Sequence, residues 1–295
     1  MAKKQNLFLI PAVCLAWGFV MPFAQAQQNK TIREVVAGDK KGEEAVVRTA
    51  SIEFTNHLGM KFVQIDSVSP LFSIWETRVA DFRAFLAVSG RRTKQVYFKQ
   101  RGDHPVVNVS WEDAIAFCSW LTRKELQSGV LPEGCRYRLP TSEEWSLAVG
   151  MPPPEDPLKQ LSVDTSASGY PWGAEWPPQK GAGNYHPDLA VDTFQATAPV
   201  GSFTANQFGL YDLGGNVWEW CQDQYGNSVD FRTLRGASWR MRSAGDLLSG
   251  FTIGNITSLR LETYGFRVVL DLPKSQRSVI LKKLPSSSGQ SSKKN

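Results

Sequence analysis

The stretch Gly209-Leu-Tyr-Asp-Leu-Gly-Gly-Asn-Val-Trp-Glu-Trp-Cys-Gln-Asp223 packs large aromatic side chains, adjacent glycines and oxygen-bearing groups into one short segment. Glycine lets the main chain curl, and curled backbone leaves carbonyl groups free. Carboxylates such as Asp212 and Glu219, together with free carbonyls, are the oxygen ligands that calcium prefers. A Trp-rich turn packed into a core is the commoner explanation of such a string. The segment is therefore either a core turn or a calcium-binding turn.

Upstream of this stretch the sequence predicts three short helices. Thr77 is the expected cap of the first, which ends at Ser89-Gly90. Ser110 with Asp113 is typical of a capping box for the second, and Thr141 with Glu144 opens the third. After Trp145 the chain is rich in proline, glycine and loops, and connections of this length need aromatic packing or bound cations to hold them.

The two ends of the chain differ from its centre. Residues 1–26 have a basic start, an apolar run and the small-x-small sequence Ala24-Gln25-Ala26, which predicts a signal peptide cleaved near Ala26 and hence export. A membrane anchor is the alternative, but Pro11 and Pro22 interrupt the run; a lipoprotein would use Cys14. Residues 27–51 read as a polar linker, 52–272 as one folded domain and 273–295 as a disordered, basic, Ser-rich tail.

The positive net charge belongs to these ends. Eight of the 33 basic residues lie in them, which leaves 25 basic against 28 acidic residues in between. A nucleic-acid-binding body is therefore not expected, although the tail could touch anionic surfaces weakly. Cys118, Cys135 and Cys221 remain in the exported chain; they allow one disulfide and one free thiol, or three buried thiols that act as small hydrophobic residues.

Six motifs in order resemble the formylglycine-generating enzyme family, the sulfatase-modifying factors. They are Asn108-Val-Ser-Trp-Glu-Asp-Ala-Ile-Ala-Phe-Cys118, Tyr137-Arg-Leu-Pro-Thr-Ser-Glu-Glu-Trp145, Thr197-Ala-Pro-Val200, Gly209 to Trp220, Leu234-Arg-Gly-Ala-Ser-Trp239 and Gly265-Phe-Arg-Val268. The resemblance implies a single α+β domain of the variant C-type-lectin kind, loop-rich, with few short helices and with bound calcium.

The resemblance also implies the calcium ligands. One set comprises Asp212, Gly215, Val217 and Glu219, and the other comprises Asn184, Tyr185, Asp192 and Phe194. Tyr185 and Phe194 would contribute backbone carbonyls. We therefore expect Ca²⁺ as a structural ion.

The oxidases of this family use two cysteines that bind copper, and those positions fall at about Met241 and Asp246 here. No cysteine follows Cys221, so a shifted alignment cannot restore the pair, and we expect no copper site. We predict an exported, non-catalytic domain that binds an extended peptide, a protein or a glycan. The alternative is a formylglycine-generating oxidase that acts on a sulfatase cysteine through an unrecognised site.

In the enzymes of this family an extended peptide lies in a groove, and the resemblance implies a similar groove here. By position, its floor would comprise Trp239, Arg240, Met241, Arg242 and Ser243. Arg240 and Arg242 would favour acidic or sulfated ligands through charge-assisted hydrogen bonds, or would merely solvate a surface loop.

Overall fold

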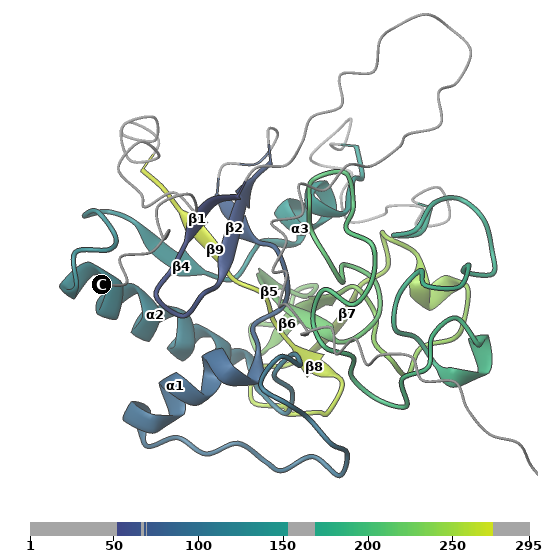
Figure 1. Ribbon diagram of the computed structural model, residues 1–295, viewed down its shortest axis with the longest axis horizontal. Coiled ribbons are helices and arrows are strands. Elements are labelled where there is room, and N and C mark those ends of the chain that lie inside the picture. The colour runs from purple at the N-terminus through teal and green to yellow at the C-terminus, as the bar shows by residue number, and fades with distance from the viewer. Residues whose placement is uncertain (1–51, 66–67, 69, 153–168, 274–295) are drawn as a thin grey trace, which may run out of the picture. The chain divides into compact units, whose positions relative to one another are not determined.

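A computed structural model describes residues 52–65, 68, 70–152 and 169–273. The predicted signal peptide, the predicted linker and the tail from residue 274 onward lie outside the described residues. Within the described part, two β-sheets are arranged with three α-helices and long irregular connections (Figure 1).

The first sheet has the strand order β1-β2-β3-β9-β4 and is antiparallel throughout. Its strands are β1 (Ile52–Thr55), β2 (Lys61–Gln64), β3 (Leu71–Ser73), β4 (Arg136–Arg138) and β9 (Val269–Asp271). The strand nearest the C-terminus is thus an interior strand, because β9 pairs with both β3 and β4.

The second sheet has the order β7-β6-β5-β8. Its strands are β5 (Trp218–Gln224), β6 (Phe231–Arg235), β7 (Ile253–Ile256) and β8 (Tyr264–Gly265). The β5–β8 pair is parallel and the others are antiparallel. The Trp-rich stretch that begins at Gly209 leads directly into β5, so its two tryptophans stand on a central strand of this sheet.

The three helices are α1 (Val79–Ser89), α2 (Trp111–Gln127) and α3 (Ser142–Val149), with short 3₁₀ turns η3 (Pro187–Leu189) and η4 (Gly245–Leu247). Both predicted capping boxes are confirmed, because Ser110 and Thr141 each accept the backbone N–H of the acidic residue three positions on, at 3.1 Å. The predicted Thr77 cap is wrong by one residue. Arg78 occupies that position, and its N–H is satisfied by Asp81 at 2.9 Å.

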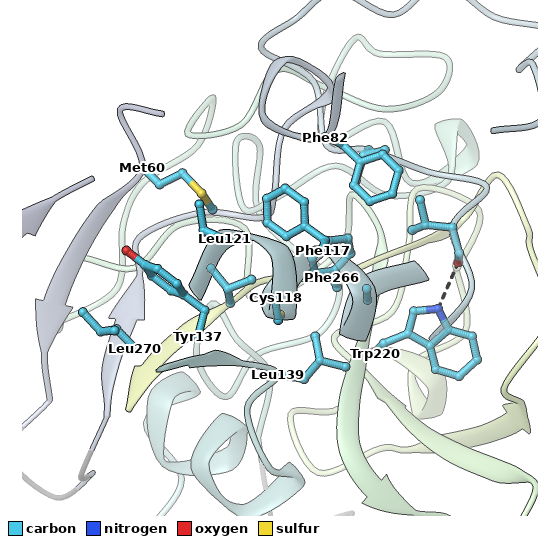
Figure 2. Close-up of a cluster of buried hydrophobic side chains, with 14 of the residues drawn as sticks. Met60, Phe82, Phe117, Cys118, Leu121, Tyr137, Leu139, Trp220, Phe266 and Leu270 are labelled. Atoms are coloured by element: carbon cyan, nitrogen blue, oxygen red, sulfur yellow. Dashed lines mark hydrogen bonds between the residues drawn. The ribbon is translucent and has the colours of Figure 1, made fainter. Parts of the chain in front are cut away.

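The main core is rich in aromatic side chains and is built from residues of α1, α2 and strands of both sheets (Figure 2). Phe82, Phe117 and Phe266 pack together with ring centroids between 5.6 and 6.1 Å apart. Trp220 is fully buried, and its indole N–H donates to the carbonyl of Val109 at 3.1 Å. These contacts tie elements that are distant in sequence, so they offset the small amount of regular structure.

The α+β class that the sequence predicts is confirmed by this arrangement, as are the scarcity of helices and the abundance of loops. Within the described residues, none of the helices is both long enough and apolar enough to span a bilayer.

Candidate functional site

The Trp-rich stretch forms a tight turn that lies directly against the segment around Asn184. Asp212, Gly215 and Asn216 have positive φ angles of 56°, 82° and 57°. The N–H of Asn216 donates to the carbonyl of Asn184 at 2.8 Å, and a Cβ on Gly215 would lie 2.3 Å from that carbonyl oxygen. Glycine is required at this point. The two residue sets predicted for calcium are therefore neighbours.

Asn216 organises the contact between the two sets. Its Oδ1 accepts from the Asn184 side chain at 3.0 Å and from the Ala198 N–H at 2.9 Å, and its Nδ2 donates to Glu76 Oε1 at 3.0 Å. Sequence reasoning selected neither Asn216 nor Glu76. The available signal was a lone carboxylate, Glu76, at the end of the apolar run that contains β3.

A fully buried ion pair stands beside this contact. Arg267 donates through Nε and Nη2 to the two oxygens of Glu219, at 2.7 and 2.6 Å, and both side chains are essentially inaccessible. The indole N–H of Trp145 donates to the same carboxylate at 2.9 Å. Glu219, predicted as a calcium ligand, is therefore already engaged by a guanidinium and an indole.

Two further carboxylates, those of Glu76 and Asp212, lie in the same interior as the guanidinium of Arg267. Burial, and next the neighbouring Asp212, raise the pKa of Glu76 well above its usual value, while Arg267 opposes the shift. Burial also raises the pKa of Asp212 to about 6. Glu76 Oε2 and Asp212 Oδ1 accept no hydrogen bond from any donor in the described part of the chain, but the two carboxylates are close enough to share a proton, which partly offsets the raised pKa of Asp212.

These orphaned oxygens fit a bound cation, because buried polar atoms are normally paired and a divalent ion would supply the missing partner. Asp212 is one predicted ligand, and Glu76 adds a second carboxylate that the sequence did not reveal. Among the described residues, no three His, Cys, Asp or Glu side chains are grouped so that they alone could hold a metal ion. Backbone carbonyls, such as those predicted from Gly215 and Val217, would have to complete the coordination.

The second predicted set is brought together by Asp192. Its carboxylate accepts the N–H of Tyr185 at 3.1 Å and that of Phe194 at 2.7 Å, which draws both backbones around one side chain. The Oδ1 of Asn184 is buried without a partner among the described residues. Burial raises the pKa of Tyr185, and Asp212 and then Asp192 raise it further. The Tyr185 ring lies against Gly214 and Gly215, so this residue contacts both predicted sets.

In the segment predicted as the groove floor, Arg240, Arg242 and Ser243 are exposed, and both arginines form ion pairs. Trp239 is buried, and Phe98 packs edge-on against it with ring centroids 5.7 Å apart. Arg240 forms an ion pair with Glu262 at 2.5 Å. Its guanidinium also lies 4.7 Å from the centroid of the Trp239 ring.

Arg242 is likewise paired, with the carboxylate of Asp188, and only Ser243 among the predicted floor residues is exposed without a charged partner in the described part. Both arginines are exposed and each forms a surface ion pair, so an acidic ligand at this segment would compete with Asp188 and Glu262; their role in binding stays a prediction. The partners, Asp188 and Glu262, come from loops distant in sequence, so no local pattern announces them.

The two residues near which the resemblance places the oxidase cysteines, Met241 and Asp246, pack as parts of the scaffold. Met241 is half-buried against the main core, and its carbonyl accepts the N–H of His186 at 3.1 Å. Asp246 lies within the 3₁₀ turn η4.

Cys118, Cys135 and Cys221 are all free and buried, which matches the interpretation as small hydrophobic residues and not the disulfide. Burial raises the pKa of each thiol, in Cys135 to about 11, so the thiolate that copper requires is disfavoured at neutral pH.

The sequence profile described as the sulfatase-modifying factor enzyme 1-like domain matches residues 44–272. The chain belongs to this family. The match begins inside the segment predicted as a linker. The variant C-type-lectin-like domain expected from the six motifs is thereby confirmed.

Among curated relatives, the inactive C-alpha-formylglycine-generating enzyme 2 of Mus musculus is 33% identical over 217 residues, which are 72% of this chain and 60% of that protein. The formylglycine-generating enzyme of Thermomonospora curvata is 30% identical over 213 residues, 68% of this chain and 61% of that protein. The chain thus spans about three fifths of the length of these relatives.

Two solved structures share the fold. PvdO from Pseudomonas aeruginosa aligns with a TM-score of 0.51 and 23% identity, covering 69% of this chain and 80% of that one. Treponema denticola variable protein 1 aligns with a TM-score of 0.52 and 20% identity, covering 74% of this chain and 98% of that one.

Proposed function

We propose that this chain is an exported, non-catalytic member of the family, stabilised by calcium, that binds an extended peptide, protein or glycan partner. The observation that carries the proposal is that no cysteine follows Cys221, so the region around Met241 and Asp246, where the resemblance places the copper-binding pair, offers no thiol. Without two accessible thiolates, the soft linear site that copper(I) needs cannot form there. The scaffold that presents a groove to a partner remains.

An assay of turnover tests the catalytic part of the proposal. The purified protein is incubated with copper, oxygen, a reductant and a peptide that carries the sulfatase cysteine motif, and the conversion of thiol to aldehyde is followed by mass spectrometry. We expect no conversion above a control with copper alone. Conversion above that control would favour the alternative, an oxidase that uses an unrecognised site, and would be in keeping with the 30% identity to an enzyme named for that activity.

Calcium, when bound, would supply positive charge and coordination to the orphaned oxygens. Asp192 with Asn184 would hold one ion, and Asp212 with Glu76 and nearby carbonyls would hold the other. A ligand at a hundred times its dissociation constant stabilises a fold by about 2.7 kcal/mol. Addition of calcium after chelation should therefore raise the melting temperature, and magnesium should do so less because it demands stricter octahedral geometry.

Matched variants identify the ligands. Asp192→Asn should reduce the calcium-dependent rise in melting temperature, whereas Asp230→Asn, at an exposed position outside both sets, should leave it unchanged. Equal responses in the two variants would remove Asp192 from the site. Export is tested separately, by sequencing the N-terminus of the secreted chain, which should begin near residue 27.

A further inference from the structure

A groove of about 410 Å³, lined by both apolar and polar side chains, lies between α1 and the loop that follows it, residues 91–101. Phe82 and Leu86 form the helix side of the groove, and Val96 and Phe98 form the loop side. Figure 1 shows this loop running back along α1. The groove is distinct from the predicted calcium ligands, none of which lines it.

The loop is strongly basic. It contains five basic residues and no acidic one, in the order Arg91, Arg92, Lys94, Lys99 and Arg101. Arg91 is paired with Asp113 at 2.8 Å and Arg101 with Asp103 at 3.0 Å. Within the described ranges, the other three have no ion-pair partner and are exposed.

The groove itself is lined by one of these three cations, Lys94, and by one more from α1, Arg83. Arg83 is also exposed and without an ion-pair partner in the described part of the chain. Apolar walls and unpaired positive charge therefore occur at the same place. The segment selected from sequence, by contrast, has both of its arginines paired.

Most backbone N–H groups of the loop are also unpaired in the described part of the chain, although the carbonyls of Lys94 and Gln95 accept from Asn108. None of the N–H groups of residues 92–100 donates a hydrogen bond to another protein group in the described ranges. The loop is nevertheless held in place, because the hydroxyl of Tyr97 accepts from Arg240 at 2.5 Å and Phe98 packs against Trp239. The rim of the groove is fixed before a ligand arrives, which lowers the entropic cost of binding.

We propose that this groove docks an extended, acidic segment of a partner protein, with one apolar side chain of the partner inserted between α1 and the loop. The inference rests on the partner-binding function proposed above and names its chemistry. Free cations favour carboxylates, the apolar walls favour a hydrocarbon side chain, and open N–H groups suit pairing with an extended backbone. A sulfated glycan supplies charge without the apolar anchor, and a membrane surface supplies no backbone to pair.

The probe is a fluorescent twelve-residue peptide of glutamate and serine with one central leucine, titrated with the full exported chain and followed by anisotropy. Arg83→Gln combined with Lys94→Gln should weaken binding about tenfold. The matched control, Arg123→Gln with Lys180→Gln, removes the same charge at two exposed positions outside the groove and should change binding less than twofold. Replacing the leucine of the peptide by serine should weaken binding by about tenfold or more.

Several results would overturn the inference. Equal loss in the two double variants would reduce the effect to net charge, and equal binding of the leucine and serine peptides would remove the anchor. Displacement of the peptide by a sulfated oligosaccharide or by anionic vesicles, without any dependence on leucine, would reassign the surface to those ligands. Equally tight binding of a peptide in which every glutamate is replaced by lysine would reject the preference for acidic partners, although the chain would still bind a peptide. If no peptide binds, the docking inference fails, while the calcium and turnover assays still decide the rest of the proposed function.

Discussion

Arg267 holds Glu219 through two hydrogen bonds of 2.7 and 2.6 Å in an interior that also contains the carboxylates of Glu76 and Asp212. The same arginine opposes the raised pKa of both neighbouring acids. It therefore interacts favourably with ionised Glu76 and Asp212 as well as with its partner Glu219.

Replacement of this arginine should be costly. Arg267→Met leaves buried carboxylates uncompensated, and loss of one partner of a buried pair costs about 3–5 kcal/mol. Urea unfolding of the calcium-free protein measures the change. Arg136→Met, which removes an exposed pair with Asp271, should cost less than about 1 kcal/mol. A similar loss in both variants would show that the buried pair has no special weight.

The contact between the two predicted calcium sets depends on the absence of a side chain at Gly215. Gly215→Ala places a Cβ 2.3 Å from the Asn184 carbonyl oxygen at a positive φ, so we expect a loss of about 3 kcal/mol or more in the free energy of unfolding. Gly226→Ala shares a positive φ but meets no atom within 4 Å, and should cost about 1 kcal/mol. Chemical denaturation gives the free energy of unfolding of both variants. Gly215→Ala reports the steric clash together with the backbone strain, and Gly226→Ala reports the backbone strain alone.

His104 should make stability depend on pH. Burial lowers its pKa in the folded protein below the ordinary value of 6.5, although Asp103 partly opposes the shift. The unfolded chain then takes up a proton more readily than the folded one, so this contribution to stability is present above pH 6.5 and declines as the pH falls toward the folded pKa. Asp212, whose pKa is raised to about 6, and Glu76 act in the opposite sense, because the folded protein binds their protons more readily than the unfolded chain does. The His104 contribution is therefore isolated by comparison: on acidification from pH 8 to pH 5, the melting temperature of the unmodified protein should fall further, or rise less, than that of His104→Gln. Identical profiles for the two proteins would show that His104 does not contribute.

The three buried cysteines should be unreactive in the native protein. Because burial raises the pKa of each thiol, a thiol reagent at pH 8 should label none of them until denaturant is added, when all three should react. Mass spectrometry of the labelled peptides counts the sites. Fewer than three labelled cysteines after unfolding without reductant would indicate the disulfide that the sequence also allowed.

The features that sequence reasoning identified are mainly local. The capping boxes at Ser110 and Thr141 require residues three positions apart, and the motif order suffices for the family and its fold. The predicted N-cap, Thr77, was wrong because the carboxylate of Asp81, in the first turn of α1, accepts the backbone N–H of Arg78. Arg78 is therefore the N-cap residue.

The features that were missed depend on contacts across the chain. Glu76 meets Asn216 across 140 positions, and Arg240 and Arg242 find carboxylates in loops that no period or spacing connects to them. These side-chain contacts depend on how irregular segments pack against one another. Such segments lack the hydrophobic periodicity from which helices and strands are predicted. The calcium ligands stay predictions, because the residues are assembled but the ion is a proposal.

The interior position of β9 has a consequence for when the domain can fold. Residues 269–271 close the first sheet between β3 and β4, and β8, a few residues earlier, pairs with the start of β5. Until this segment has emerged from the ribosome, β3 lacks one of its two neighbours and β4 lacks the strand with which it pairs, and pairing across some 200 positions must follow. The first sheet is therefore completed only after residue 271 has been synthesised.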